Sequence, residues 1–375
     1  MLPLDPARLA LVVAGLLLIP PGRPTAAQLA LLITIAVLLA VSAIRNVRTA
    51  TILVLLGGGI AIRLVIVAHE GSDVLDVTAA AIQRVLDGFS PYGSGYDQSR
   101  PPGAPFPYGP VALLWYMPLA SAPDLIELAG SFAVAVVLAL QGRLVGLAVY
   151  ATAPVLVATA VDGSNDTSLG LLLLAAFMAT TRWPAVGAAV LAVAVGFKLS
   201  ALAWLPGLIV LGGARVAAAF VAASLVVWSP VIAAWGVRAF IRSAQLANDA
   251  HQTTAWSLGS IIRDVTGVRV AELDQLRFVL GGLMAGASVL LARSLDRVIL
   301  AGSAVYLVTL HAGNWATFAY FAALAPLICW RLDDWLGLPS RPLIPASVRL
   351  PGLRFDRAVR AGTGATTGRE DRPRV

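Results

Sequence analysis

Charged side chains are scarce in this sequence: only 13% of its 375 residues are Asp, Glu, Lys or Arg, whereas 58% are hydrophobic. Because soluble domains are roughly a quarter charged, this composition excludes an ordinary soluble protein. Apolar runs recur along the chain without the alternating pattern of barrel strands, and in lipid a helix satisfies its own backbone hydrogen bonds. The predicted fold class is therefore all-α, a polytopic transmembrane helical bundle.

Cysteine is almost absent, and the motifs of several enzyme classes are missing as well. The one cysteine, Cys329, excludes an internal disulfide and any cysteine-cluster metal site. We find no P-loop, no dinucleotide fingerprint and no Ser/His/Asp or Cys/His nucleophile arrangement. The sequence therefore predicts no cofactor and no metal ligands, although the polar loop 161–168 leaves a hydrated divalent cation open.

The formal net charge is +7, and the arginines that carry it lie in short loops between apolar runs and in the C-terminal tail. This placement follows the positive-inside rule for cytoplasmic loops and does not form a basic binding face. The predicted partners are therefore membrane lipids, with no nucleic acid. Residues 338–375 are rich in Pro, Gly and Arg, which predicts a disordered basic cytoplasmic tail attracted to anionic head groups.

Residues 1–337 are predicted to form one transmembrane domain of about 12 helices with both termini in the cytoplasm. The run 109–120 reaches only about 18 Å, too short to cross a bilayer, so we interpret it as an interfacial or re-entrant helix within a large external loop, 69–124. Residues 184–213 are also compatible with one long helix, which would invert every later span. The predicted spans lie near 8–20, 28–44, 51–68, 125–141, 144–161, 168–181, 184–197, 200–213, 216–235, 277–292, 297–311 and 316–330.

The external loop 69–124 opens with carboxylates at spacings of three, among them Asp73 and Asp76. With Ser72 as N-cap, this pattern predicts an amphipathic helix that lies along the membrane interface. The acids either complement the helix dipole or supply a general base. For the second role, partial desolvation at head-group level would raise the pKa of the base.

Lys198 is the only lysine of the chain and lies within an apolar run, VAVGFKLSALAWLP. A cation in such a run marks a functional or partnered site by default, and here the ammonium group would bind a lipid phosphate. The alternative is a lysine that snorkels to the head groups. In the loop 161–168, Asp162, Asn165 and Asp166 are predicted to bind sugar hydroxyls or a cation, unless that loop is only a turn that caps the next helix.

Two further external segments carry candidate binding residues. Arg238 and Arg242 lie four apart in a helix-compatible stretch and would bind a phosphate, with His251 farther along the same loop. His311 lies at another external helix end, in the motif HAGNW. A solvated loop or an ordinary interfacial residue is the alternative at each of these positions.

Two stretches of the chain resemble a known family of membrane enzymes. SDV, GFSPYG and PYGPVALLWYMPL resemble the first-loop signature of GT-C superfamily membrane glycosyltransferases, and GSNDTSLG with GFKLSALAWLP resembles the family's polar turn and lysine-containing helix. The resemblance covers roughly residues 60–330 and is greatest to bacterial polyprenyl-phosphate-mannose-dependent mannosyltransferases. The chain departs from the family pattern at Gly109, where a second proline is common, and at Ser164, where glutamine is common.

The resemblance implies an inverting transfer of a sugar, mannose in that subfamily, from a polyprenyl-phosphate donor to a lipid or glycan acceptor. The site would lie on the extracytoplasmic side of a multi-pass plasma-membrane protein. The family pattern makes Asp73, or second Asp76, the base that takes the proton of the acceptor hydroxyl, and Lys198 the cation that stabilises the departing phosphate. Tyr92 and Tyr108, in the two tyrosine motifs, are predicted to bind substrate.

A polytopic transporter or lipid flippase is the rival interpretation, in which Asp73, Asp76 and Lys198 line the path. Transporters commonly contain inverted repeats and place their sites near the membrane midplane. The two halves of this sequence show no detectable repeat, and the polar residues gather at one predicted face. These features favour the glycosyltransferase, with a non-catalytic scaffold of the same fold as a third alternative.

Overall fold

The computed structural model describes residues 26–45, 47–65, 71–250, 256–267 and 272–338. All regular elements in these ranges are helices, and their only extended pairing is an isolated bridge between Gly95 and Pro105. The prediction of an all-α fold is therefore confirmed. The predicted span 8–20, His251 and the tail from residue 339 onward lie outside the described residues.

Each predicted apolar run within the described ranges contains helix, and several of these runs are divided between two helices. The run 144–161 is broken at Pro154 into two short helices. In chain order the helices are α2 (Ala26–Ile44), α3 (Arg48–Val65), α4 (Val74–Leu86), α5 (Pro110–Tyr116), η1 (Met117–Leu119), α6 (Asp124–Leu140), α7 (Leu144–Thr152), α8 (Pro154–Thr159), α9 (Asp166–Thr180), α10 (Pro184–Phe197), η2 (Leu199–Trp204), α11 (Leu205–Trp235), α12 (Val237–Ala250), α13 (Leu258–Thr266), α14 (Leu273–Leu291), α15 (Leu295–His311) and α16 (Tyr320–Trp335).

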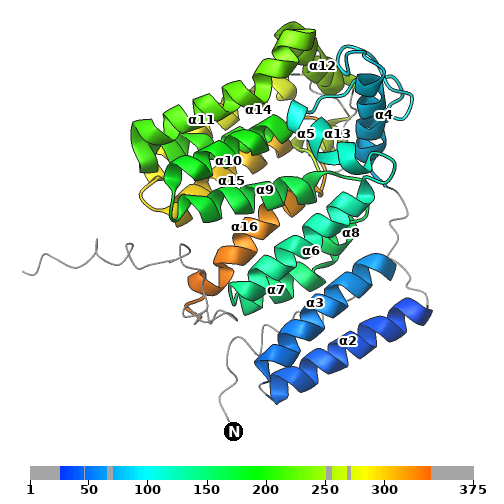
Figure 1. Ribbon diagram of the computed structural model, residues 1–375, viewed down its shortest axis with the longest axis vertical. Coiled ribbons are helices and arrows are strands. Elements are labelled where there is room, and N and C mark those ends of the chain that lie inside the picture. The colour runs from blue at the N-terminus through cyan, green and yellow to red at the C-terminus, as the bar shows by residue number, and fades with distance from the viewer. Residues whose placement is uncertain (1–25, 46, 66–70, 251–255, 268–271, 339–375) are drawn as a thin grey trace, which may run out of the picture.

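The bundle has two distinct ends (Figure 1). α4, α5, α12 and α13 gather at one end, which we call the cap end. The turns that join α6 to α7, α9 to α10 and α14 to α15 lie at the opposite end, which we call the turn end. The bundle helices α6, α9, α10, α14, α15 and α16 run between these two ends, so the long polar connections and the short basic turns are separated.

α11 is broken at Gly213, whose φ of 64° and ψ of −155° are not helical. Gly212 lies beside the start of α10 at the turn end, whereas Trp228 lies at the cap end beside the loop that precedes α5. The chain therefore turns back at Gly213, and the segments 199–212 and 214–235 run in opposite directions. The prediction of two separate runs in this part of the chain agrees with that reversal.

Arg63 connects α3 to the break between α7 and α8. Because Pro154 has no N–H, the carbonyl of Tyr150 loses its helical partner. The buried guanidinium of Arg63 donates to the carbonyl oxygens of Tyr150 at 2.8 Å and Ala151 at 3.0 Å. This charged side chain, which lies in an apolar run, therefore supplies hydrogen-bond donors to backbone carbonyls at a helix break.

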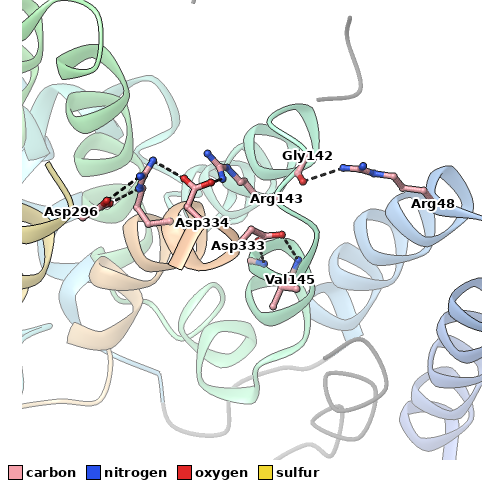
Figure 2. A network of polar contacts seen from close by, with 9 residues as sticks. Arg48, Gly142, Arg143, Val145, Asp296, Asp333 and Asp334 are labelled. Carbon is pink, nitrogen blue, oxygen red and sulfur yellow. Dashed lines mark hydrogen bonds and ion pairs between the residues drawn. The ribbon is translucent and has the colours of Figure 1, made fainter. Parts of the chain in front are cut away.

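Polar contacts also join the helices at the turn end (Figure 2). Arg331 pairs with Asp296 at 2.7 Å and with Asp334 at 2.8 Å, and Asp334 also accepts from Arg143. Arg48 donates to the carbonyl of Gly142 at 3.1 Å, which ties α3 to the turn between α6 and α7. The short turns are therefore held by ion pairs and backbone contacts from neighbouring helices.

Several helices have the length and composition of membrane spans. Arg48–Val65 and Leu199–Trp235 are long and apolar enough to cross a membrane, and α5–η1 with α6 forms a third candidate that is bent by 101°. The arm of α11 after Gly213, residues 214–235, reaches roughly 33 Å at about 1.5 Å per residue, close to the thickness of a hydrocarbon core. The predicted association with a membrane is supported by these helices.

Asp333 provides a test of this packing. Its buried carboxylate accepts from the backbone N–H groups of Val145 at 3.2 Å and Gly146 at 2.9 Å, in the first turn of α7. Asp333→Ala is expected to lower the free energy of unfolding by about 1–3 kcal/mol, because two buried donors lose their acceptor. Denaturation in detergent micelles measures the change. Asp264→Ala, in an exposed ion pair, is the control, with an expected change below about 0.5 kcal/mol; equal losses would contradict the packing described.

Candidate functional site

A cavity of about 260 Å³ lies at the cap end, where three parts of the chain that carry polar motifs meet. Asp73 lies at its rim, directly before the first residue of α4, and Tyr108 comes from the loop before α5. Asp166 lies at the start of α9 and Lys198 at the end of α10. The structure therefore brings Asp73 and Lys198, predicted from distant parts of the sequence, into one cavity.

The N-terminus of α4 is held in place by the backbone of the loop that precedes α9. The N–H of Ser72 donates to the carbonyl of Asp162, and the N–H of Leu75 donates to the carbonyl of Gly163 at 3.0 Å. Gly163 has a φ of 81°, and a Cβ there would overlap the carbonyl oxygen of Ser72. Glycine is therefore required at position 163 both by backbone conformation and by close approach.

Ser72, the predicted cap of α4, lies one residue before the N-cap position, and its hydroxyl accepts from the N–H of Val74 at 3.3 Å. Asp73 is the N-cap residue, and its side chain makes no capping bond to the helix. Of the first N–H groups of α4, that of Val74 donates to Ser72 and that of Leu75 donates to the carbonyl of Gly163. The carboxylate of Asp73 is instead free to turn outward, where it accepts from the backbone N–H of Arg100 at 2.5 Å.

Lys198 occupies the wall of the cavity opposite the solvent-facing loops. Its ammonium group donates to Asp166 at 2.7 Å and to the side-chain oxygen of Asn165 at 3.3 Å. It also lies 5.7 Å from the ring centroid of Tyr108 and 5.0 Å from that of Tyr320, within cation–π range. Lys198 itself is extended, with φ −146° and ψ 119°, which excludes one continuous helix through this position.

Two glycines bring the loop of Tyr108 against the end of α10. The N–H of Gly109 donates to the carbonyl of Phe197 at 3.3 Å, and a Cβ on Gly109 would overlap the carbonyl oxygen of Gly196. This contact places Tyr108 beside Lys198. Desolvation, with the negative charges of Asp166 and then Asp73, raises the pKa of the Tyr108 hydroxyl, so it stays protonated and able to donate.

Arg277 and Tyr320 line the cavity but were not predicted as site residues. Arg277 is buried in the first half of α14, and Tyr320 is buried at the start of α16. Arg277 follows a polar stretch at the start of an apolar run, so it looked like one more interfacial arginine of the kind that recurs in this sequence. Only the packing of α14 against α11 and α15 turns its side chain toward Lys198's cavity.

Asp162, which the sequence places with Asn165 and Asp166 in the polar loop 161–168, also lies at the cavity. It lines the cavity with only 7% of its surface exposed, and its carboxylate accepts from the N–H of Ser164 at 2.8 Å. Burial raises the pKa of its carboxyl to about 6, an effect that the hydrogen bonds from Ser164 only partly oppose. The site therefore contains one aspartate that titrates near neutral pH.

Other predicted residues lie elsewhere. Asp76 is exposed on α4 and does not line the cavity. Tyr92 is buried among Phe106, Trp235 and Phe240, and its hydroxyl donates to the carbonyl of Tyr108 at 3.2 Å. It supports the loop of Tyr108 from behind, so the structure gives it a packing role where we predicted contact with substrate.

The predicted phosphate-binding arginines of α12 also point away from the cavity. Arg238 and Arg242 are exposed, whereas Ala244 and Ala247 are the α12 residues that line the cavity. His311 does not line the cavity either; its Nδ1 lies 2.9 Å from the carbonyl oxygen of Trp256. Helical periodicity explains the first result, since the arginines and the alanines lie on different faces of α12.

No group of three or more His, Cys, Asp and Glu side chains within the described ranges is arranged to hold a metal ion. Comparison of the chain with family models, with curated proteins and with solved structures gives no match. The functional assignment below therefore depends on the geometry of the cavity and on the sequence motifs that line it.

The close approach at Gly163 predicts an unequal response to two similar substitutions. Gly163 and Gly88 both have positive φ, but only a Cβ on Gly163 meets other atoms. Gly88→Ala is expected to cost about 1–2 kcal/mol from backbone conformation alone. Gly163→Ala adds overlap with Ser72 and is expected to cost clearly more and to release α4 to proteolysis. Denaturation in detergent and limited proteolysis measure both effects; equal behaviour of the two variants would contradict the docking of α4 on this loop.

Asp162 predicts a pH dependence of stability. Because its pKa rises from 3.8 to about 6, the folded protein binds this proton more tightly than the unfolded chain. Its contribution is therefore fully present below pH 3.8 and is lost as the pH rises through about 6. In the wild type the melting temperature should fall as the pH rises through this range, and Asp162→Asn is expected to make that fall smaller. Asp97→Asn, at an exposed position, is the control and is expected to keep the wild-type dependence of melting temperature on pH. An unchanged slope in Asp162→Asn would refute this role.

Proposed function

We propose that this protein is a membrane glycosyltransferase of the GT-C type, which transfers a sugar, mannose by resemblance, from a polyprenyl-phosphate donor to a lipid or glycan acceptor. The observation that carries the proposal is the shared cavity of Asp73 and Lys198. A carboxylate and a cation facing one cavity are the two groups that an inverting transfer of this kind needs: one to take a proton and one to receive a leaving phosphate.

In the proposed reaction the oxygen of the acceptor hydroxyl attacks the anomeric carbon of the donor sugar. The bond from that carbon to the phosphate oxygen breaks, and the phosphate leaves with the electron pair. The acceptor proton passes to the carboxylate of Asp73, which lies at the rim of the cavity. Asp76 is not retained as the base, because it is exposed and outside the cavity.

The phosphate would be received by Lys198 and Arg277 together. Lys198 is already paired with Asp166 at 2.7 Å, so part of its charge is balanced within the protein. Arg277 adds a second cation from α14, and Tyr108, whose ring centroid lies 5.7 Å from the ammonium group of Lys198, adds a hydroxyl donor.

The membrane orientation that we propose sets the bundle axis across the bilayer, with the cap end outside and about 12 helices spanning. The short turns at the turn end carry the arginines of the positive-inside pattern, including Arg143, Arg182 and Arg293. The cap end instead carries the amphipathic α4 and the cavity. In this orientation the donor lipid and the acceptor would both approach from the outer leaflet of the plasma membrane.

Asp73→Asn tests the base. The variant is expected to insert and fold normally but to lose at least about 100-fold in sugar transfer from a polyprenyl-phosphate donor, because the amide cannot accept the proton. Asp76→Asn, on the exposed side of the same helix, is the control and is expected to keep at least half of the activity. Transfer is measured with a radiolabelled donor and membrane lipid acceptors. Full activity in Asp73→Asn would remove Asp73 from the reaction.

Lys198→Met tests the phosphate site. The substitution removes the charge with little change in length, so membrane insertion is expected to stay normal while the apparent KM for the donor rises and kcat falls. Arg182→Met, at the turn end, is the matched control. Uptake of solute or movement of lipid in proteoliposomes without any glycosylated product would favour the transporter or flippase and overturn the proposal.

A further inference from the structure

A buried carboxylate lies directly behind the cavity and belongs to none of the groups discussed so far. Glu127, in the first turn of α6, is 1% exposed. Its Oε1 accepts from the hydroxyl of Tyr116 at 2.5 Å and from the hydroxyl of Ser168, and its Oε2 accepts from the N–H of Ser168 at 3.0 Å. One side chain therefore joins α6 to α5 and to the first turn of α9.

Both partners of Glu127 lead to the ion pair in the cavity. Ser168 follows Asp166 by two residues in the first turn of α9, so the bond to its N–H fixes the turn that carries Asp166. Tyr116 and Trp115 pack against Phe197, with ring centroids 5.9 Å and 6.4 Å apart, and Phe197 directly precedes Lys198. Trp115 also donates to the hydroxyl of Ser168 at 2.9 Å. Glu127 thus hydrogen-bonds to Ser168, beside Asp166, and to Tyr116, which packs against the residue that precedes Lys198.

Packing alone does not account for an acid at this position. A buried carboxylate must be desolvated, and an apolar residue of similar size often gives equal or greater stability. The carboxylate does something that an apolar residue cannot, because it accepts three hydrogen bonds that have fixed directions. Such bonds fix how α5 and α9 are rotated about their axes and how closely they pack against α6.

We propose that Glu127 is a positioning residue that fixes the Lys198–Asp166 pair in the cavity through Ser168 on one side and Tyr116 with Phe197 on the other. Its effect on catalysis rests on the proposed function, since it acts through Lys198 at the donor phosphate. A displacement of about 1 Å at a reacting group can cost on the order of 100-fold in rate, so a support of this kind has a measurable consequence.

The chain offers an assay of this positioning that needs no substrate. Lys198 is the only lysine, so an amine-reactive reagent that labels a lysine side chain reports on Lys198 alone. In the wild type the ammonium group is held by Asp166 and Asn165, which should make labelling slow. Mass spectrometry of the peptide that contains Lys198 gives the labelling rate and separates it from labelling of the N-terminal amine.

Glu127→Gln is expected to raise the labelling rate of Lys198 about 5-fold and to lower kcat about 10-fold, with a smaller change in the KM for the acceptor. The amide keeps the shape of the side chain but can accept at only one of its two terminal atoms. Asp124→Asn makes the same chemical change on an exposed residue of the same helix and is expected to leave both values within 2-fold of wild type. Tyr116→Phe, which removes one donor, repeats the test if Glu127→Gln folds poorly.

A double-mutant cycle separates positioning from general stability. If Glu127 acts through the pair, Glu127→Gln will add little to the labelling rate of Asp166→Asn, whereas independent effects would multiply. Unchanged labelling in Glu127→Gln and Tyr116→Phe, or multiplicative effects in the cycle, would overturn the proposal. A wild type that transfers no sugar but shows these labelling rates would instead refute the proposed function and leave the positioning role standing.

Discussion

The contact on which the site depends is between two pieces of backbone: the start of α4 and the loop that precedes α9. The N–H of Ser72, just before α4, and that of Leu75, in its first turn, donate to the carbonyls of loop 161–165, and Gly163 permits an approach that any side chain would prevent. Without this contact, Asp73 would be carried on a separate amphipathic helix. With it, Asp73 lies at the rim of a cavity whose wall is formed by Lys198 and Asp166. The polar motifs at residues 72–76 and 161–168 meet because backbone hydrogen bonds join these two segments.

The same region shows how a charged cavity is built inside an apolar bundle. Each buried charge has a partner that limits its desolvation: Lys198 has Asp166 and Asn165, Glu127 has three donors, and Arg63 has backbone carbonyls at a helix break. The groups in the cavity differ from Arg63 in facing open space. The cavity lies at the cap end, while the charged contacts at the turn end hold short connections together (Figure 2).

Hydrophobic periodicity was enough to predict the all-α fold, the amphipathic α4 and most helix boundaries, because these depend on local pattern. Lys198 could be singled out because a lone lysine in an apolar run is costly. Arg277 and Glu127 could not, since their importance comes from which helix faces meet. Arg238 and Arg242 were misplaced for the related reason that the face of α12 that turns inward is set by tertiary packing. The docking of α4 was missed because backbone acceptors from a distant loop leave no pattern in the sequence.

Zero-length cross-linking tests the central claim, that Lys198 lies in an external cavity beside carboxylates, most directly. A water-soluble, membrane-impermeant carbodiimide applied to intact cells joins an amine only to a carboxylate within direct contact, and the single lysine makes the product unambiguous. The structure, oriented as proposed, predicts an amide between Lys198 and Asp166, which are 2.7 Å apart. A cross-link from Lys198 to Asp296 or Asp334 at the turn end, or one that forms only after the cells are opened, would contradict it.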